Sequence, residues 1–219
     1  MTTKKLGCSQ ETLKLIACIT MLIDHIGSMF FPDYFIFRAI GRIAFPIYCF
    51  QLVEGVYHTS NKSKYGLRLF IGILLAEIPF DLAMYGQLTW EHQSVMVTLF
   101  LGYIMIIMCN TSAKPMRPII IVAFMILSEL LQVDYGLIGI LTIVVFYITH
   151  NTTMIWTILG LTLIACLNTP QCFALLAVMP LMTYTGQKTT KSKAIQYWFY
   201  LFYPIHLLLL YLVHLMTGY

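Results

Sequence analysis

Long hydrophobic runs separated by short polar stretches dominate this chain of 219 residues. A helix needs about 20 mainly apolar residues to cross a bilayer, and fewer when it is broken or buried among other helices. On this rule the pattern predicts about nine membrane-spanning helices. Their expected ranges are 13–31, 37–57, 67–85, 95–109, 118–131, 137–149, 154–167, 173–184 and 196–216.

The composition agrees with this pattern, because 59% of the residues are hydrophobic and only 10% are charged. A soluble domain carries about 25% charged residues. We therefore expect an all-α protein, a polytopic helical bundle embedded among membrane lipids, with residues 1–219 forming a single domain. The spans leave no room for a second folded domain, so any active site has to lie between helices.

The basic residues lie in alternate loops of this pattern. They are Lys4 and Lys5, then Lys62, Lys64 and Arg68, then Lys114 and Arg117, then Lys188, Lys191 and Lys193. Because cytoplasmic loops are enriched in Lys and Arg, nine spans place the N-terminus in the cytoplasm and the C-terminus outside. Orientation accounts for the net charge of +4, so nucleic acid is not expected as a partner.

The six cysteines form no recognisable pattern of metal ligands or disulfides. They are Cys8, Cys18, Cys49, Cys109, Cys166 and Cys172, and no CxxC or Cys/His spacing links them. We expect neither a metal site nor a disulfide framework.

An adjacent acid and histidine, Asp24 and His25, lie inside the first hydrophobic run, a little past the expected midplane. A charge at the bilayer centre costs about 2.5 to 3.5 kcal/mol on the insertion scale, so such residues face a partner or a polar cavity. Histidine exchanges a proton near neutral pH, and we expect His25 to act as a general base. Neighbours on a helix point about 100° apart, so Asp24 is expected to contact another helix.

Further charges reach a similar depth in the next two spans. Arg38 and Arg42 are four residues apart, as are Glu77 and Asp81, so each pair shares a helix face. One interpretation is purely structural: Arg42 neutralises one of the carboxylates and holds three helices together. The other is a polar cavity with a function, since a bundle that only packs would use small residues. Gly41 and Pro46 bracket Arg42 and predict a weak point in that helix.

Two more groups of residues complete the candidate site. His206 lies at mid-depth of the last span beside Pro204, either as a second cavity wall or as a histidine satisfied by a neighbouring backbone group. At the cytoplasmic end of the second span, Glu54 and His58 are followed by three basic residues, Lys62, Lys64 and Arg68. A cationic mouth there would suit a phosphorylated cytoplasmic donor, although the same lysines also satisfy the positive-inside rule.

Four segments of the first 82 residues resemble one known family. They read Met-Leu-Ile-Asp-His-Ile-Gly at 21–27, Phe-Arg-Ala-Ile-Gly-Arg-Ile-Ala-Phe-Pro-Ile at 37–47, Leu-Val-Glu-Gly-Val-Tyr-His-Thr at 52–59 and Glu-Ile-Pro-Phe-Asp-Leu at 77–82. These segments resemble the TraX proteins, which are similar to transmembrane acyltransferases that use acetyl-CoA. The resemblance is close over residues 13–82, and Tyr-Pro-Ile-His at 203–206 adds to it.

The resemblance implies a multi-pass enzyme of the bacterial inner membrane, an acetyltransferase whose acyl donor is acetyl-CoA. The acceptor implied is an amine or hydroxyl, on a peptide, a pilin-like N-terminus or an envelope glycan. The implied motif residues are Asp24, His25, Arg38, Arg42, Glu54, His58, Arg68, Glu77 and Asp81.

The roles that we expect follow from acyl-transfer chemistry. His25 would be the base, with Asp24 and Arg42 as its catalytic partners. Arg38, Glu54, His58, Glu77, Asp81 and His206 would bind substrate, and Lys62, Lys64 and Arg68 would hold the nucleotide of acetyl-CoA.

A transporter is the competing hypothesis, because intramembrane Asp, Glu and His residues also relay protons or bind cations. Against it, the sequence contains no inverted repeat and no pair of matching broken helices. A third interpretation, a purely structural assembly factor, has to explain the buried ionisable residues by packing alone.

Overall fold

The computed structural model describes residues 7–167, 169–187 and 192–217. Lys4, Lys5, Lys188 and Lys191, on which part of the predicted orientation rests, lie outside these residues. Within them every regular element is helical, and only two isolated β-bridges occur. The α-helices are α1 Gln10–Phe30, α2 Phe35–Gly41, α3 Ala44–His58, α4 Lys62–Tyr85, α5 Val95–Thr111, α6 Arg117–Leu130, α7 Gly136–Thr149, α8 Met154–Leu167, α9 Val178–Met182 and α10 Lys193–Thr217, with 3-10 helices η1 Lys114–Met116 and η2 Thr169–Ala177.

Local sequence signals set the ends of the helices that build the site. Helix α1 begins after Ser9, whose hydroxyl accepts a hydrogen bond from the backbone N–H of Thr12 at 3.2 Å. Helix α4 begins in the same way after Asn61, whose side chain accepts from the N–H of Lys64 at 2.8 Å. It ends at Gly86, which has a φ of 70° and therefore takes the left-handed conformation that glycine adopts without strain.

Three stretches of the described chain are long and apolar enough to cross a membrane. They are Gln10–Phe30, Phe35–His58 and Tyr197–Thr217. Four shorter apolar helices accompany them, at Val95–Thr111, Gly136–Thr149, Met154–Cys166 and Cys172–Met182. The all-α fold expected from the sequence is thus confirmed for the described residues, together with helices apolar enough to cross a membrane, whereas the count of about nine crossings and the cytoplasmic N-terminus stay predictions.

Two predicted spans differ from the helices that form. The run expected at 37–57 is divided into α2 and α3 at Arg42, next to Gly41, as the weak point in the sequence predicts. The run expected as one helix at 173–184 consists of η2 followed by the five residues of α9. Pro180 lies inside α9 and has no backbone N–H to donate, which explains why this segment does not form one long α-helix.

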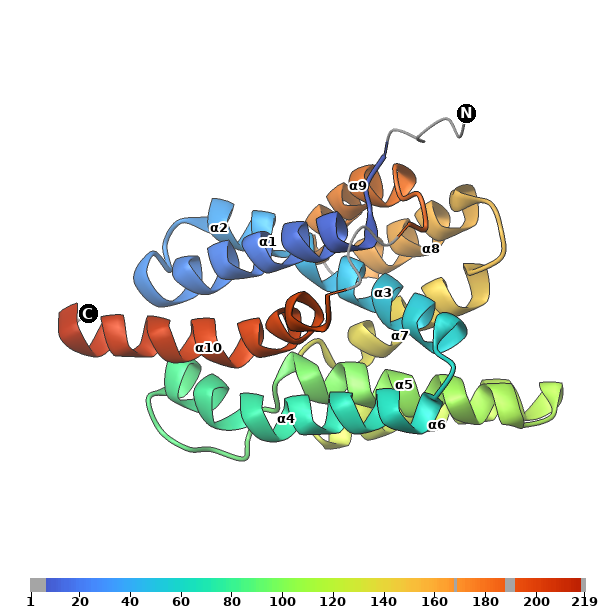
Figure 1. Ribbon diagram of the computed structural model, residues 1–219, viewed down its shortest axis with the longest axis horizontal. Helices are drawn as coiled ribbons and strands as arrows, with labels where there is room; N and C mark the ends of the chain where they lie inside the picture. The colour runs from blue at the N-terminus through green and yellow to red at the C-terminus, as the bar shows by residue number, and fades with distance from the viewer. Residues whose placement is uncertain (1–6, 168, 188–191, 218–219) are drawn as a thin grey trace.

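Three long helices, α1, α4 and α10, run in the same direction along the molecule, with α10 between the other two (Figure 1). Helices α3, α5 and α7 contact one another and form the centre of the bundle. Side chains such as Ile47, Met105 and Ile140 are fully buried there. Leu163 on α8 is 69% exposed, as expected for a residue that faces lipid.

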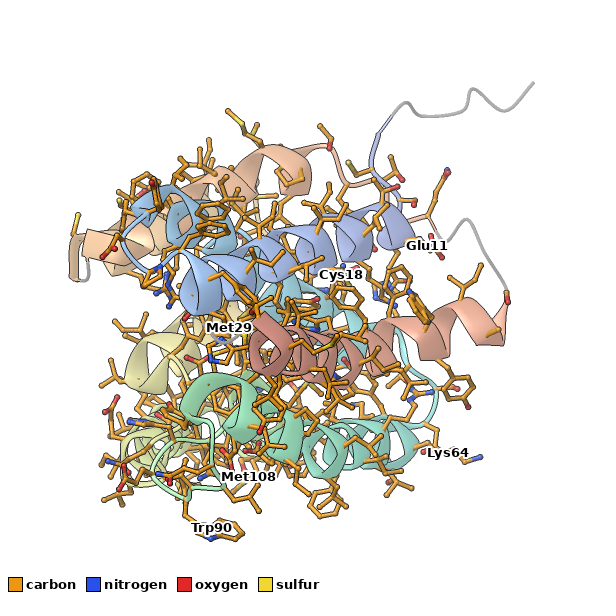
Figure 2. The ribbon with its side chains drawn as sticks, turned by 90° about the vertical axis from the view of Figure 1, so that its left-hand side faces the viewer. Glu11, Cys18, Met29, Lys64, Trp90 and Met108 are labelled. Carbon is orange, nitrogen blue, oxygen red and sulfur yellow. The ribbon has the colours of Figure 1, made fainter. Side chains whose placement is uncertain are left out.

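The connections between helices gather at two opposite ends of the bundle. At one end, Cys8 pairs with Tyr184 in an isolated bridge, and His150 after α7 contacts Glu54 near the end of α3. At the other end, Gln93 pairs with Val133. Lys64 belongs to the first end, whereas Trp90 belongs to the second, is 90% exposed and points away from the helices (Figure 2). Such an arrangement is what helices that alternate in direction require.

We expect Gly41→Ala to destabilise the fold. A Cβ atom at this position would overlap the carboxylate and Cβ of Asp24, so α1 and α2 could no longer pack as closely. Overpacking of this kind costs about 1–3 kcal/mol, more than the gain in helix propensity from glycine to alanine. The thermal unfolding midpoint in detergent should fall clearly below that of Leu74→Ala, a control at a position 61% exposed on α4. Equal midpoints would show that the two helices are not closely packed.

Candidate active site

Two histidines meet in the interior of the helical bundle. His25 on α1 and His206 on α10 are 9% and 5% exposed, and a hydrogen bond of 2.7 Å joins Nδ1 of His25 to Nε2 of His206. Their rings are nearly parallel, with centroids 5.0 Å apart. The sequence placed these residues 181 positions apart, and the fold brings them into direct contact because α10 packs beside α1.

The hydrogen bonds of this pair determine which nitrogen carries each proton. Nδ1 of His206 lies 2.7 Å from the backbone oxygen of Phe202, so this nitrogen is the donor. In a neutral ring Nε2 of His206 is then an acceptor, and Nδ1 of His25 has to donate to it. The remaining nitrogen of His25, Nε2, therefore carries a lone pair. This is the tautomer that a general base needs.

Asp24 contacts another helix, as the 100° offset from His25 predicts. One oxygen of its carboxylate accepts a hydrogen bond from Arg38 on α2 at 2.9 Å, and the other is buried without a partner among the described residues. Arg42, the neutralising cation of the purely structural interpretation, instead lies over the ring of Tyr135, 5.4 Å from its centroid. Arg42 is one turn further along than Arg38, at the break between α2 and α3, where the chain changes direction.

The other two predicted carboxylates serve the loop after α4. Glu77 accepts a 2.6 Å hydrogen bond from the hydroxyl of Ser94 and weaker ones from its N–H. Asp81 accepts from the N–H of Thr89 at 3.1 Å. These contacts hold residues 86–94 against α4, and neither carboxylate lines the cavity beside His25. The five ionisable residues expected in one polar cavity are thus divided between two places.

A cavity of about 30 Å³ lies next to His25. Its walls include Asp24, Tyr48 and Tyr203, together with Asp134 and Tyr135 from the loop between α6 and α7. Tyr135 has a φ of 66°, which is strained for a tyrosine, and its ring stacks on Phe45 with centroids 3.9 Å apart. The sequence gave no signal for Asp134 or Tyr135, because a loop residue between two hydrophobic runs reads as solvent-exposed.

Asp134, in the loop between α6 and α7, is a buried carboxyl with a perturbed pKa. Burial raises the pKa of its carboxyl to about 6, and the guanidinium of Arg42 limits that rise. The negative charge of Asp24 raises this pKa further, and the positive charge of Arg38 lowers it by a smaller amount. A carboxyl in this state changes its charge close to the physiological range.

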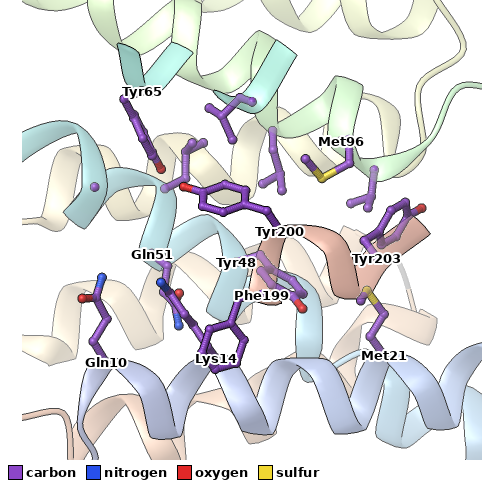
Figure 3. Close-up of a pocket in the computed structure, with 15 residues that line it drawn as sticks. Gln10, Lys14, Met21, Tyr48, Gln51, Tyr65, Met96, Phe199, Tyr200 and Tyr203 are labelled. Carbon is purple, nitrogen blue, oxygen red and sulfur yellow. The ribbon is translucent and has the colours of Figure 1, made fainter. Parts of the chain in front are cut away.

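A second cavity, of about 140 Å³, adjoins the first and extends toward the other end of α1 (Figure 3). Four residues belong to the walls of both cavities: Met21, Tyr48, Val95 and Tyr203. Most of its remaining wall is apolar or aromatic, as with Leu69, Leu99 and Phe199, but Lys14 and Gln51 also line it. We call this space the middle cavity.

A third cavity, of about 320 Å³, opens at the end of the bundle where α3 ends and α4 begins. It shares Gln10, Lys14, Gly55, Tyr65, Phe199 and Tyr200 with the middle cavity. Its wall includes Arg68, whose guanidinium lies 5.6 Å from the centre of the Tyr65 ring, whereas Lys62 and Lys64 are exposed outside it. We call this space the mouth.

Glu54 lies on the wall of the mouth with two histidines beside it. Its carboxylate is 2.8 Å from Nε2 of His150 and 3.6 Å from Nδ1 of His58. His150 also stacks on Tyr57, with centroids 4.1 Å apart. His150 was missed by the sequence analysis, because a single histidine in a short loop carries no spacing signal. The described residues contain no cluster of His, Cys, Asp and Glu suited to a metal ion.

Comparison with known proteins identifies the family. The sequence model of the TraX protein family matches residues 9–214, almost the whole chain. This chain belongs to the TraX family. The resemblance seen in four segments of the sequence is thereby confirmed, and it extends over the middle helices and α10.

Two curated proteins are similar in sequence to this TraX protein. One is the "Probable fimbrial assembly protein FimC, serogroup H1" of Dichelobacter nodosus, 29% identical over 238 aligned positions that cover 95% of this chain and 96% of the relative. The other is an uncharacterized protein of Rickettsia prowazekii (strain Madrid E), 34% identical over 93 residues, which cover 42% of this chain and 34% of that protein. No solved structure matches this TraX protein at a significant level.

We expect the stability of this TraX protein to depend on pH through Asp134. A raised pKa means that the folded protein binds more protons than the unfolded chain between about pH 4 and about pH 6, so stability falls as pH rises through that range. Asp134→Asn removes the buried charge and should raise the unfolding midpoint at pH 7.5, but not at pH 4. A midpoint lowered at pH 7.5 but not at pH 4 would contradict the raised pKa and show that Arg42 stabilises the ionised carboxylate.

Proposed function

We propose that this protein is a membrane-embedded acyltransferase, which moves an acetyl group from cytoplasmic acetyl-CoA to an amine or hydroxyl acceptor. The observation that carries the proposal is the row of three adjacent cavities from the mouth to His25. Membership of the TraX family supports it. The proposal extends to about nine membrane crossings, a cytoplasmic N-terminus and the bacterial inner membrane.

The mouth has the chemistry to hold the nucleotide part of the donor. Arg68 supplies a cation for phosphate, and Tyr200 and Phe199 supply aromatic faces on which a base can stack. Lys14 lines both the mouth and the middle cavity. From Lys14 to His25 the rise along α1 is about 16 Å, a distance that an extended arm carrying the thioester would span.

The histidine pair has the chemistry for the transfer itself. Nε2 of His25 takes a proton from the acceptor as its nitrogen or oxygen forms a bond with the thioester carbonyl carbon. The carbon–sulfur bond then breaks, and the departing thiolate receives that proton from His25. His206 stabilises the positive charge that His25 carries between the two steps, because Nε2 of His206 accepts from Nδ1 of His25.

The two arginines lie near the cavity beside His25 and act through residues that line it. Arg42 supports Tyr135, whose side chain lines the cavity, and Arg38 neutralises Asp24. The free oxygen of Asp24 and the carboxyl of Asp134 are suited to bind an amine acceptor. The name of the Dichelobacter relative, which refers to fimbrial assembly, makes a pilin-like N-terminus the first acceptor to test, ahead of an envelope glycan.

A proton- or cation-coupled transporter is the second candidate. The buried pair of histidines and the nearby Asp24, all in membrane helices, are residues that such a protein would use. The acyltransferase is favoured because three adjacent cavities connect the histidines with one end of the bundle.

We expect His25→Ala to reduce CoA release from acetyl-CoA in the presence of amine acceptors by about 10²–10⁴-fold, the range for losing general-base assistance, and His206→Ala to reduce it less, because the base itself remains. His92→Ala, at an exposed position in the loop after α4, should keep full activity. The measurement is thiol release by purified protein in detergent, with unfolding midpoints as the control for folding. A wild-type protein that is folded but neither binds acetyl-CoA nor releases CoA would favour the transporter.

The proposed orientation places Lys64 in the cytoplasm and Trp90 outside. In a variant without native cysteines, Trp90→Cys should react with a membrane-impermeant maleimide on intact spheroplasts. Lys64→Cys should react only after the membrane is opened. The reverse pattern would put the mouth on the outer side, out of reach of cytoplasmic acetyl-CoA.

A further inference from the structure

Gln51 on α3 is a polar residue on the wall of the middle cavity (Figure 3). It lies on the same face of α3 as Tyr48, Leu52 and Gly55, which also line that cavity. Tyr48 is the other polar residue of this set, and its hydroxyl lies 3.4 Å from the sulfur of Cys18. Gln51 is thus the amide that this face of α3 presents to the cavity.

The side-chain nitrogen of Gln51 is buried and has no hydrogen-bond partner among the residues that the structure describes. A buried amide donor that stays unpaired costs about 1–3 kcal/mol. A methionine of similar volume would avoid this cost in a wall that also contains Leu69, Val95 and Leu99. The position of the amide therefore points to a ligand that supplies an acceptor.

The shape of the surroundings limits what that ligand can be. The middle cavity holds about 140 Å³ between the mouth, which contains Arg68, and the smaller cavity beside His25. An alkyl chain would fill it but would offer nothing to the nitrogen of Gln51. A slender chain with secondary amides would both occupy the apolar space and accept a hydrogen bond.

We propose that Gln51 is a specificity-determining residue that donates a hydrogen bond to an amide carbonyl in the arm of the thioester donor. This inference rests on the proposed function and adds a preference among acyl donors to it. Donors that carry an amide between the nucleotide and the thioester are preferred over thioesters that do not. Gln51 acts in binding and takes no part in the proton transfer at His25.

The test compares three acetyl donors with the purified protein. Acetyl-CoA carries two arm amides, S-acetyl-N-acetylcysteamine carries one, and S-butyl thioacetate carries none. We expect Gln51→Met to lower kcat/KM for amide-bearing donors about 3- to 10-fold, the worth of one neutral hydrogen bond, and to leave S-butyl thioacetate unchanged. Leu69→Met, on the same cavity wall, serves as the matched control and should not discriminate between donors.

The unfolding midpoint is a second measurement, and a purely structural role of Gln51 predicts a different change in it. Because Gln51→Met removes an unpaired buried amide, the unfolding midpoint should stay the same or rise. A lower midpoint together with equal losses for all three donors would overturn the inference and make Gln51 a packing residue. No change with any donor would overturn it as well.

The outcomes also separate this inference from the proposed function. If the wild-type protein uses acetyl-CoA but Gln51→Met does not discriminate between donors, only the role of Gln51 falls. If folded wild-type protein shows neither turnover with any of the three donors nor binding of CoA, both proposals fall together.

Discussion

The hydrogen bond between His25 and His206 is the constraint around which the rest of the site is arranged. Hydrocarbon offers no partner to an imidazole, so each ring has to be satisfied by another helix. The bond fixes α1 against α10, and the link from His206 to the backbone oxygen of Phe202 fixes the tautomer of both rings. A basic nitrogen on His25 is the consequence of this packing.

The same packing explains why cavities lie along α10. Aromatic residues from this helix, Phe199, Tyr200 and Tyr203, stand at successive levels between α1 and α4 and hold those helices apart. Gly55 on α3 keeps space between the mouth and the middle cavity, since a Cβ atom there would lie 2.6 Å from the hydroxyl of Tyr65. Large rings and one missing side chain thus create the space that connects the end of the bundle with its buried histidines.

Much of this fold could be predicted from hydropathy, whereas the pairing of charges could not. The pattern located α1 and the weak point at Gly41, because these depend on local sequence. The choice of Arg38 over Arg42 depends on how α2 is rotated about its axis, and that is decided by tertiary packing. Asp134 and Gln51 escaped notice for the related reason that single polar residues gain meaning only from the cavity beside them.

The two ends of the site differ in a way that constrains any acyl transfer. A donor that occupies the mouth and the middle cavity approaches His25 along α1 from one end, past Lys14 and Tyr48. An acceptor from the other end meets Asp24 bound to Arg38, whose side chain is 36% exposed. An ammonium group competes with Arg38 for the same carboxylate, so a cationic acceptor can replace one ion pair by another. A neutral hydroxyl could not offset the loss of the guanidinium and so could not replace Arg38 at Asp24, and this difference favours an amine.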